Sequence, residues 1–255
     1  MNNTEPELVI CPDTDRLAVA AAERVVGAAA EAVRERGRFA LALAGGSTPE
    51  KTYDLLADPS CANRIDWSRM YFFFGDERFV PPDDPRSNYH MARRSLLDYG
   101  PLAAAQVFPI PTDTPSPAAS AAAYSRTLAA FFAQPADGEP PRFDLILLGL
   151  GDDGHTASLF PHAAALHEER AWLTWSPPGV LPPPVDRVTM TFRLINAARR
   201  VMFLVAGANK AAPLRDVLEG RAPMEQRPAA GVRPADGALT WLVDQAAAGL
   251  LTKRT

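Results

Sequence analysis

The sequence predicts a single α/β domain, residues 1–255, in which a mostly parallel sheet is flanked by helices. Three observations support this class. The candidate strands are continuous apolar runs rather than alternating patterns, which is typical of strands buried on both faces. Segments of helical character separate these runs, and such alternation is the pattern of α/β folds. The chain has 255 residues, of which 47% are hydrophobic and 22% charged, so it can bury one large core.

Strands and helices alternate along most of the chain. The predicted strands are FALALAGG (39–46), MYFFFGDE (70–77), FDLILLGLG (143–151) and RVMFLVAG (200–207). The predicted helices cover residues 15–36, 49–57, 88–98, 117–132 and 209–219. RVTMTF (187–192) predicts a further strand, and LTWLVDQAAAGL (239–250) a short strand that runs into a closing helix. The Pro-rich stretches 109–117 and 176–186 are interpreted as surface loops, and the sequence leaves open whether the second is a lid.

Composition excludes several classes of function. The formal net charge of −4 argues against broad binding of nucleic acid or of anionic membranes, so neither is an expected partner. With only Cys11 and Cys61, the chain has no disulfide framework and no paired-cysteine zinc site. MNNTEPELVI at the N-terminus lacks the basic and apolar regions of a secretory signal, and no apolar run approaches the roughly 18 residues of a membrane span. We therefore expect a cytoplasmic protein.

Polar or small residues directly follow several predicted strands, where ligands bind in open α/β sheets. The first such strand end reads LALAGGSTPEKTY. Gly45 and Gly46 permit close approach of the backbone to a ligand, and Ser47 and Thr48 are good N-caps for a helix whose first position is Pro49. Free N–H groups at that helix start would bind a phosphate. The alternative is a helix cap without a ligand.

A nucleotide-binding P-loop is disfavoured at this strand end. Gly45 lies six residues before Lys51 and Thr52, as in that motif, but Glu50 stands where the motif requires glycine.

At the second strand end, three phenylalanines and Gly75 are followed by Asp76, Glu77 and Arg78. The guanidinium of Arg78 offers a rigid fork of donors that matches phosphate or carboxylate. The alternative is a plain ion pair of Asp76 and Arg78 on a solvated rim.

The third strand end is GLGDDGHTASLFP, residues 149–161, in which His155 is flanked by glycine and carboxylates. An imidazole beside a carboxylate is suited to general-base catalysis near neutral pH. Metal binding by Asp152, Asp153 and His155 is disfavoured, because no second histidine lies at a ligand spacing. A turn histidine that caps the next helix is the structural alternative.

A fourth signal is weaker. In FLVAGANKAAPLRDVL, Gly207 ends a strand and Lys210 falls in the first turn of the next helix. Acidic residues usually suit that turn, so a lysine there is better explained if an anion binds beside it. Together with Gly45, Gly46 and Arg78, it suggests a phosphate-binding site.

Four of these stretches resemble the 6-phosphogluconolactonases of the pentose phosphate pathway in order and spacing. They are LALAGGSTP, FFGDERFVPPDDPRSNYHMAR, LLGLGDDGHTASLFP and FLVAGANKA. The resemblance covers residues 8 to 250, and DGHTASLFP is its most specific part. It implies a modified Rossmann-like fold, and the hydrolysis of 6-phospho-D-glucono-1,5-lactone to 6-phosphogluconate without metal or organic cofactor. The implied partner is this small sugar-phosphate lactone. The oligomeric state stays open between a monomer and a small homo-oligomer.

The resemblance also implies roles for residues. His155 matches the histidine that activates water, and Asp153 the carboxylate of the same loop; Asp76 lies in a matching motif as a further catalytic candidate. The segments that would surround the substrate phosphate hold Gly45, Gly46, Ser47, Thr48, Arg78 and Lys210. The chain departs from the family pattern at Asp152, where proline is common, and at His162, where glycine is usual.

Two other functions remain open. Glucosamine-6-phosphate deaminases share the DGH element but carry a glutamate five residues after the histidine, where this chain has Phe160. Non-catalytic sugar-phosphate sensors of the same fold carry an N-terminal DNA-binding domain, whereas this chain is expected to start almost at its first strand.

Overall fold

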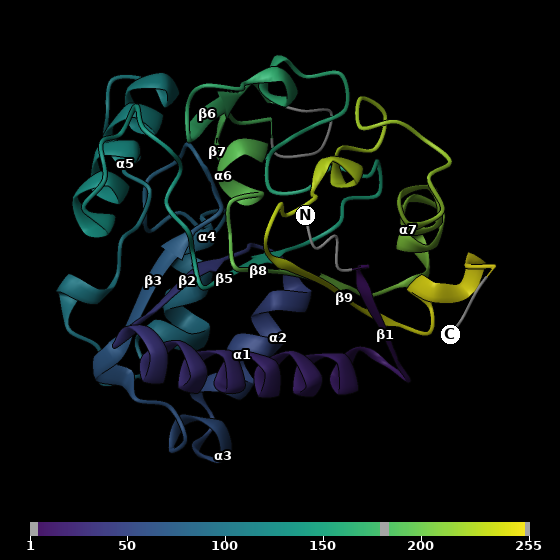
Figure 1. Ribbon diagram of the computed structural model, residues 1–255, viewed down its shortest axis with the longest axis horizontal. Helices are drawn as coiled ribbons and strands as arrows, with labels where there is room; N and C mark the ends of the chain where they lie inside the picture. The colour runs from purple at the N-terminus through teal and green to yellow at the C-terminus, as the bar shows by residue number, and fades with distance from the viewer. Residues whose placement is uncertain (1–4, 179–183, 253–255) are drawn as a thin grey trace.

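The protein is described by a computed structural model that covers residues 5–178 and 184–252. Its main element is a six-stranded sheet in which all neighbouring strands are parallel (Figure 1). In spatial order the strands are β1 (Glu7–Cys11), β9 (Ala238–Asp244), β8 (Arg200–Val205), β5 (Leu145–Leu148), β2 (Phe39–Leu43) and β3 (Met70–Phe74). Strands β2 and β5 are buried along their whole length, which confirms the interpretation of their apolar runs.

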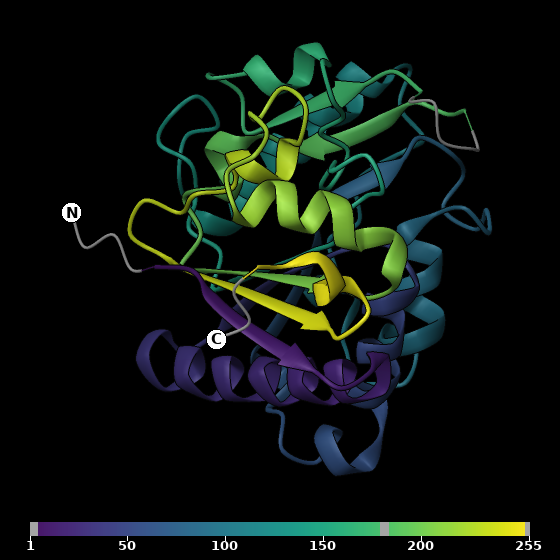
Figure 2. The ribbon, with the colours of Figure 1, turned by 90° about the vertical axis from the view of Figure 1, so that its right-hand side faces the viewer.

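Helices cover both faces of this sheet, as Figures 1 and 2 show. On one face lie α1 (Thr14–Arg36) and α2 (Ser47–Ala57), followed by the short α3 (Pro59–Ala62). On the other face lie α5 (Pro117–Phe132), α6 (Phe192–Ile195) and α7 (Ala211–Leu218). The predicted mostly parallel sheet flanked by helices is therefore confirmed.

A second, smaller sheet stands on the face of α5 to α7. It contains β4 (Asp76–Arg78), β7 (Arg187–Met190) and β6 (Leu173–Ser176), paired antiparallel in that order. The prediction of one strand over 70–77 was wrong, because Gly75 breaks the run. The Gly75 N–H donates to Leu43 O in the large sheet, and its carbonyl accepts from Met190 N in the small one.

Other element boundaries differ from prediction by a turn or less. The segment 88–98 forms α4 (Asn88–Ala92) and then a π-helical turn (Arg93–Leu97). A 3-10 turn (Ala208–Lys210) precedes α7, and the predicted closing helix is only a 3-10 turn (Ala247–Leu250). Of the Pro-rich stretch 176–186, residues 179–183 lie outside the described residues.

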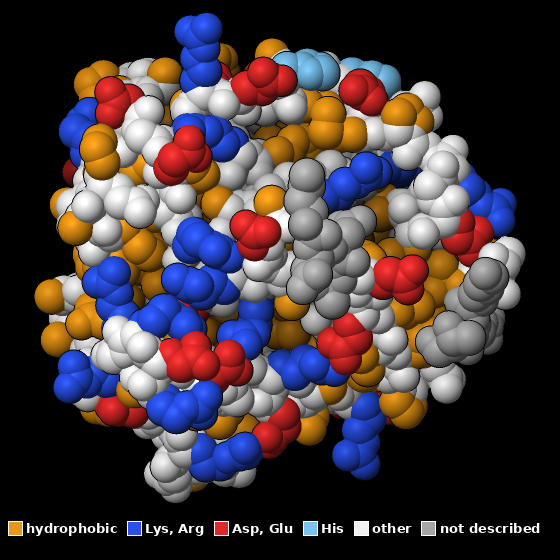
Figure 3. Space-filling view, viewed as in Figure 1, with side chains coloured by type: hydrophobic (Ala, Val, Ile, Leu, Met, Phe, Trp, Pro, Cys, Tyr) orange, Lys and Arg blue, Asp and Glu red, His pale blue; other side chains and the backbone are white. Residues whose placement is uncertain are grey.

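One buried cluster fills the space between the layers. It includes Leu41 and Phe203 of the large sheet as well as Leu173 and Val188 of the small one. On the face in Figure 3, basic and acidic side chains lie next to one another. Among the described helices, none is long and apolar enough to cross a membrane.

Candidate active site

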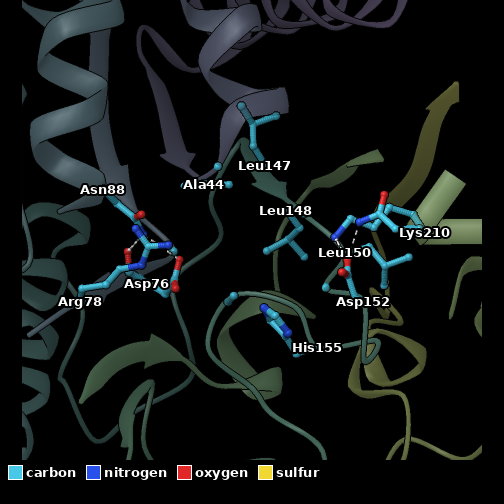
Figure 4. Close-up of a pocket in the computed structure, with 17 residues that line it drawn as sticks. Ala44, Asp76, Arg78, Asn88, Leu147, Leu148, Leu150, Asp152, His155 and Lys210 are labelled. Carbon is cyan, nitrogen blue, oxygen red and sulfur yellow. Dashed lines mark hydrogen bonds and ion pairs between the residues drawn. The ribbon is translucent and has the colours of Figure 1, made fainter. Parts of the chain in front are cut away.

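A cavity of about 430 Å³ lies where β8, β5, β2 and β3 end. All four strands point the same way, so the segments that follow them meet at one edge of the sheet. Six of the residues predicted for a site line this cavity: Gly45, Gly46, Asp76, Arg78, His155 and Lys210. In Figure 4, Arg78 and Lys210 lie on opposite sides of it, with His155 between them on a third side.

His155 is held by its own loop. Its Nδ1 lies 2.6 Å from Asp153 Oδ1, and its backbone N–H donates to the same oxygen at 3.0 Å. When Asp153 accepts from Nδ1–H, the lone pair of the imidazole is on Nε2. Burial raises the pKa of Asp153, but the hydrogen bonds and charge of His155 outweigh this and hold it below its ordinary value. Asp153 therefore stays a carboxylate and fixes the ring, as predicted for a histidine oriented by its neighbour.

The glycines of this loop make room for the ring. A Cβ on Gly151 would lie 2.0 Å from His155 Nδ1, so only glycine leaves the ring its place. The Gly151 N–H also donates to His155 O, which closes the loop. Gly154 has a φ of 84°, in the left-handed region that favours glycine. His162, where the family usually has glycine, also has a left-handed φ of 59°.

Asp76 is a buried carboxylate in the cavity wall. Its Oδ2 accepts from the Ser158 hydroxyl at 2.6 Å, and its Oδ1 accepts from Asn88 Nδ2 at 3.2 Å. The predicted alternative, an ion pair with Arg78, is absent among the described contacts: the Arg78 guanidinium donates to Arg86 O at 2.7 Å instead.

Arg78 stands opposite a second arginine. Arg187 pairs with it in the β4–β7 ladder and is only 5% exposed. Burial, and then the charge of Arg78, lower the pKa of Arg187. Its guanidinium donates to Val185 O at 3.0 Å. Like charges opposite each other in a ladder are unfavourable, and the carboxylates of Asp76 and Glu77 partly offset them.

The glycine loop differs from prediction in its helix start. Helix α2 begins at Ser47, with Gly46 as its N-cap and no capping side chain, so Ser47 and Thr48 are first-turn residues rather than caps. The reason is Gly46, whose φ of 106° turns the chain earlier than a capping serine would. Ser47 and Thr48 lie outside the cavity lining, whereas Gly45 faces it beside Asn88.

Lys210 is placed by the turn after β8. Its amine forms an ion pair with Asp152, which also accepts from Asn209 Nδ2 at 2.8 Å. The predicted cation is therefore in the cavity wall but already has an acidic partner. Within the described part of the chain, no group of three or more His, Cys, Asp or Glu residues is arranged to hold a metal ion.

Sequence reasoning missed the residues that support the predicted ones. Ser158 and Asn88 hold Asp76, and Arg227 holds the histidine loop by donating to Asp153 O at 3.0 Å. Ser158 and Asn88 lie within the motifs GLGDDGHTASLFP and SNY, but a serine or asparagine there carries no sign of the contact it makes 82 or 12 residues away. Arg227, on a loop after α7, has no such signal at all.

The fold and this cavity define an α/β protein with a polar cavity at one edge of its parallel sheet and a carboxylate-bound histidine in the cavity wall. A family model described as glucosamine-6-phosphate isomerases/6-phosphogluconolactonase matches residues 12–241. The chain belongs to this family.

Individual relatives agree with this assignment. The chain is similar to a 6-phosphogluconolactonase of Nostoc sp., with 40% identity over 95% of this chain and 97% of that protein. It is 44% identical to a 6-phosphogluconolactonase of Synechocystis sp. over 85% of this chain and 86% of that one. Its structure resembles that of 6-phosphogluconolactonase from Trypanosoma cruzi, with a TM-score of 0.87 and 32% identity over 99% of both chains. The resemblance seen in the sequence motifs is confirmed.

Proposed function

We propose that the protein hydrolyses 6-phospho-D-glucono-1,5-lactone to 6-phosphogluconate, in the cytoplasm and within the oxidative pentose phosphate pathway. The observation that carries this proposal is the His155–Asp153 pair, 2.6 Å apart, at a cavity with a cation on either side. The names of the relatives at 40% and 44% identity support the choice of substrate.

In the proposed reaction, His155 acts as general base. Its Nε2 takes a proton from a water molecule while the water oxygen attacks the C1 carbonyl of the lactone. The bond from C1 to the ring oxygen then breaks, and the imidazolium returns its proton to that oxygen. Asp153 keeps the ring in the required tautomer and stabilises its charged form. Backbone N–H groups of the glycine loops are suited to stabilise the oxyanion formed on the way.

The phosphate end of the substrate would lie near Gly45 and Gly46, between Arg78 and Lys210. Arg187, paired with Arg78 across the β4–β7 ladder, would add positive charge to the same end. Binding there holds the carbonyl against His155, so that the remote phosphate contributes orientation to the reacting centre. Asp76, fixed by Ser158, faces the cavity as the second catalytic carboxylate and would accept hydrogen bonds from the sugar hydroxyls.

Phe160 favours this reaction over deamination. It stands five residues after His155, and the centroids of the two rings are 4.8 Å apart. A buried phenyl ring cannot relay the proton that opening of an amino sugar requires. Among the described residues, the acidic partner of the histidine is Asp153, and this arrangement suits water activation.

Freshly generated 6-phosphogluconolactone tests the proposal. The purified protein should open the lactone faster than the spontaneous rate, and it should release no ammonia from glucosamine 6-phosphate. Lactone opening at the spontaneous rate would refute the proposal and favour the alternative of a non-catalytic sugar-phosphate sensor. Ammonia release would identify a deaminase.

The phosphate site makes its own prediction. Arg78→Ala and Lys210→Ala should each raise KM for the lactone, because loss of one partner of a desolvated charge contact costs on the order of 2–5 kcal/mol of binding. Steady-state kinetics measure this. An unchanged KM in both variants would exclude a phosphate site between these two cations.

A further inference from the structure

Lys210 is already occupied by a carboxylate of this chain. Asp152 Oδ1 accepts from Lys210 Nζ and, at 2.8 Å, from Asn209 Nδ2. The two side chains differ in accessibility: Lys210 is 22% exposed and Asp152 58% exposed. In Figure 4 the pair stands on the side of the cavity opposite Arg78. A ligand that binds Lys210 must therefore compete with Asp152 for its amine.

Asp152 changes the charge of the cavity wall. The lining holds two cations, Arg78 and Lys210, and two carboxylates, Asp76 and Asp152. With His155 neutral, these four charges cancel. Asp76 is tied to Ser158 and Asn88, whereas Asp152 is engaged only on the Lys210 side among the described contacts. Asp152 is therefore the carboxylate that an incoming anion can displace.

The turn that carries Lys210 is hydrogen-bonded to the large sheet, whereas the Asp152 side chain is mostly exposed. Gly207 has a φ of 101°, its N–H donates to Asp244, and a Cβ there would lie 2.7 Å from Asn209 Oδ1. The turn that begins at Gly207 and carries Asn209 and Lys210 is therefore joined to β9 through Asp244. Asp152 sits on the Gly151–Gly154 turn with more than half of its side chain in solvent.

We propose that Asp152 is a specificity-determining residue that occupies Lys210 in place of a ligand and admits only anions that bind the lysine more strongly than a carboxylate does. A dianionic phosphate monoester meets this condition, because its charge at neutral pH is about −1.5 to −2. A monoanionic sugar acid does not. This inference rests on the proposed function for the identity of the ligand, and it assigns to Asp152 a selection between sugar phosphates and sugar acids.

The opposite role for Asp152 predicts the opposite sign. If Asp152 served to aim Lys210 at the phosphate, its removal would weaken phosphate binding. If it competes, its removal strengthens binding, and the gain depends on Lys210. A double-mutant cycle separates the two roles.

Calorimetric titration with inorganic phosphate, 6-phosphogluconate and gluconate provides the test, without any turnover. Asp152→Asn keeps the shape of the side chain and removes its charge. It should lower the dissociation constants of phosphate and 6-phosphogluconate by about three- to tenfold. It should also reduce the ratio of the affinity for 6-phosphogluconate to the affinity for gluconate. In the Lys210→Met background the same substitution should change little. Asp98→Asn, which removes the acid of the exposed Arg93–Asp98 pair, is the matched control.

Three results would overturn the inference: weaker or unchanged phosphate binding in Asp152→Asn, an equal gain in the Lys210→Met background, or an equal gain in Asp98→Asn. The lactone assay of the unmodified protein is read separately. An inactive protein in which Asp152→Asn behaves as stated would refute the proposed function and leave the anion selection standing. An active protein in which Asp152→Asn binds phosphate no more tightly would refute only the role of Asp152.

Discussion

The imidazole ring of His155 is confined by close contacts with its neighbours. Asp153 engages Nδ1 at 2.6 Å, and Phe160 packs against the ring at 4.8 Å between centroids. Gly151 lies next to Nδ1, and the imidazole fills the space that a side chain at this position would occupy. Catalysis by a general base requires hydrogen-bond reach to the reacting water, so a small displacement of this ring should be costly.

Gly151→Ala tests this constraint. The new Cβ would lie 2.0 Å from His155 Nδ1, so the ring must leave Asp153, and kcat should fall by roughly a hundredfold or more. Steady-state kinetics give kcat, and circular dichroism checks that the variant is folded. Gly149→Ala provides the comparison, because a Cβ there meets nothing within 4 Å, and it should lose less activity. Equal losses would show that the position of the ring is not the cause.

At this scale the sequence predicts the reacting groups better than their supports. Histidine, glycine and acid in one short loop are recognisable, because loop and ring interact over two or four residues. The contact of Ser158 with Asp76 spans 82 residues, and that of Arg227 with Asp153 spans 74. Such pairs form only when β4, the histidine loop and the segment after α7 come together in the fold.

Among the elements, β4 is joined to the start of α4 by the hydrogen bonds of a single buried side chain. Glu77, in its middle, is 2% exposed and accepts four hydrogen bonds of 2.7–2.9 Å. The donors are the N–H groups of Arg78, Asn88 and Tyr89 and the Ser87 hydroxyl. Burial holds the pKa of Glu77 above its ordinary value, although these four donors lower it in part. Because all four partners donate, the side chain joins β4 to the start of α4 as an acceptor on both oxygens.

Glu77→Gln should therefore destabilise the protein. One oxygen becomes an NH₂ group, which leaves at least one buried N–H facing another donor, at a cost of about 1–3 kcal/mol. Urea titration followed by circular dichroism measures the free energy of unfolding. Glu139→Gln is the control, since the Glu139 side chain is 94% exposed and should tolerate the change. A Glu77→Gln protein as stable as the control would refute this role.

The elements that sequence predicted correctly are those with a strong local pattern. The long α1 has an Asp13 cap and a left-handed Gly37 at its end, and β2 and β5 are uninterrupted apolar runs. In the small sheet, the strand predicted over 187–192 is confirmed as β7, whereas β6, with four residues, was not predicted and β4, with three, was merged with β3. Strands this short are defined by their partners, and the turn at Gly75 depends on hydrogen bonds to both sheets.

For the whole molecule, the buried cluster joins the two sheets without a break. We predict that residues 1–255 unfold as one cooperative domain. Three of the four tryptophans are buried and lie in separate regions: Trp241 is in β9, Trp67 precedes β3, and Trp172 precedes β6. Their fluorescence and the far-ultraviolet circular dichroism should show the same midpoint in urea. Two separated transitions would indicate that the small sheet and its helices form an independent unit.

The same assembly makes the site a property of the whole chain. Four neighbouring strands of the large sheet deliver the glycine loop, Asp76, His155 and Lys210 to one edge, and the small sheet brings Arg187 against Arg78. No single element contains a working site. In the proposed reaction, His155 is therefore the general base, and segments from the rest of the chain bind the substrate.

His155→Ala tests that claim most directly. With freshly generated lactone, kcat should fall by roughly a hundred- to ten-thousandfold, because a positioned acid–base group contributes about that much. The dissociation constant of 6-phosphogluconate should change little, since Gly45, Arg78 and Lys210 remain in place. A folded His155→Ala protein with near-normal kcat would contradict the account and show that another group, with Asp76 or Asp153 the first to examine, activates the water.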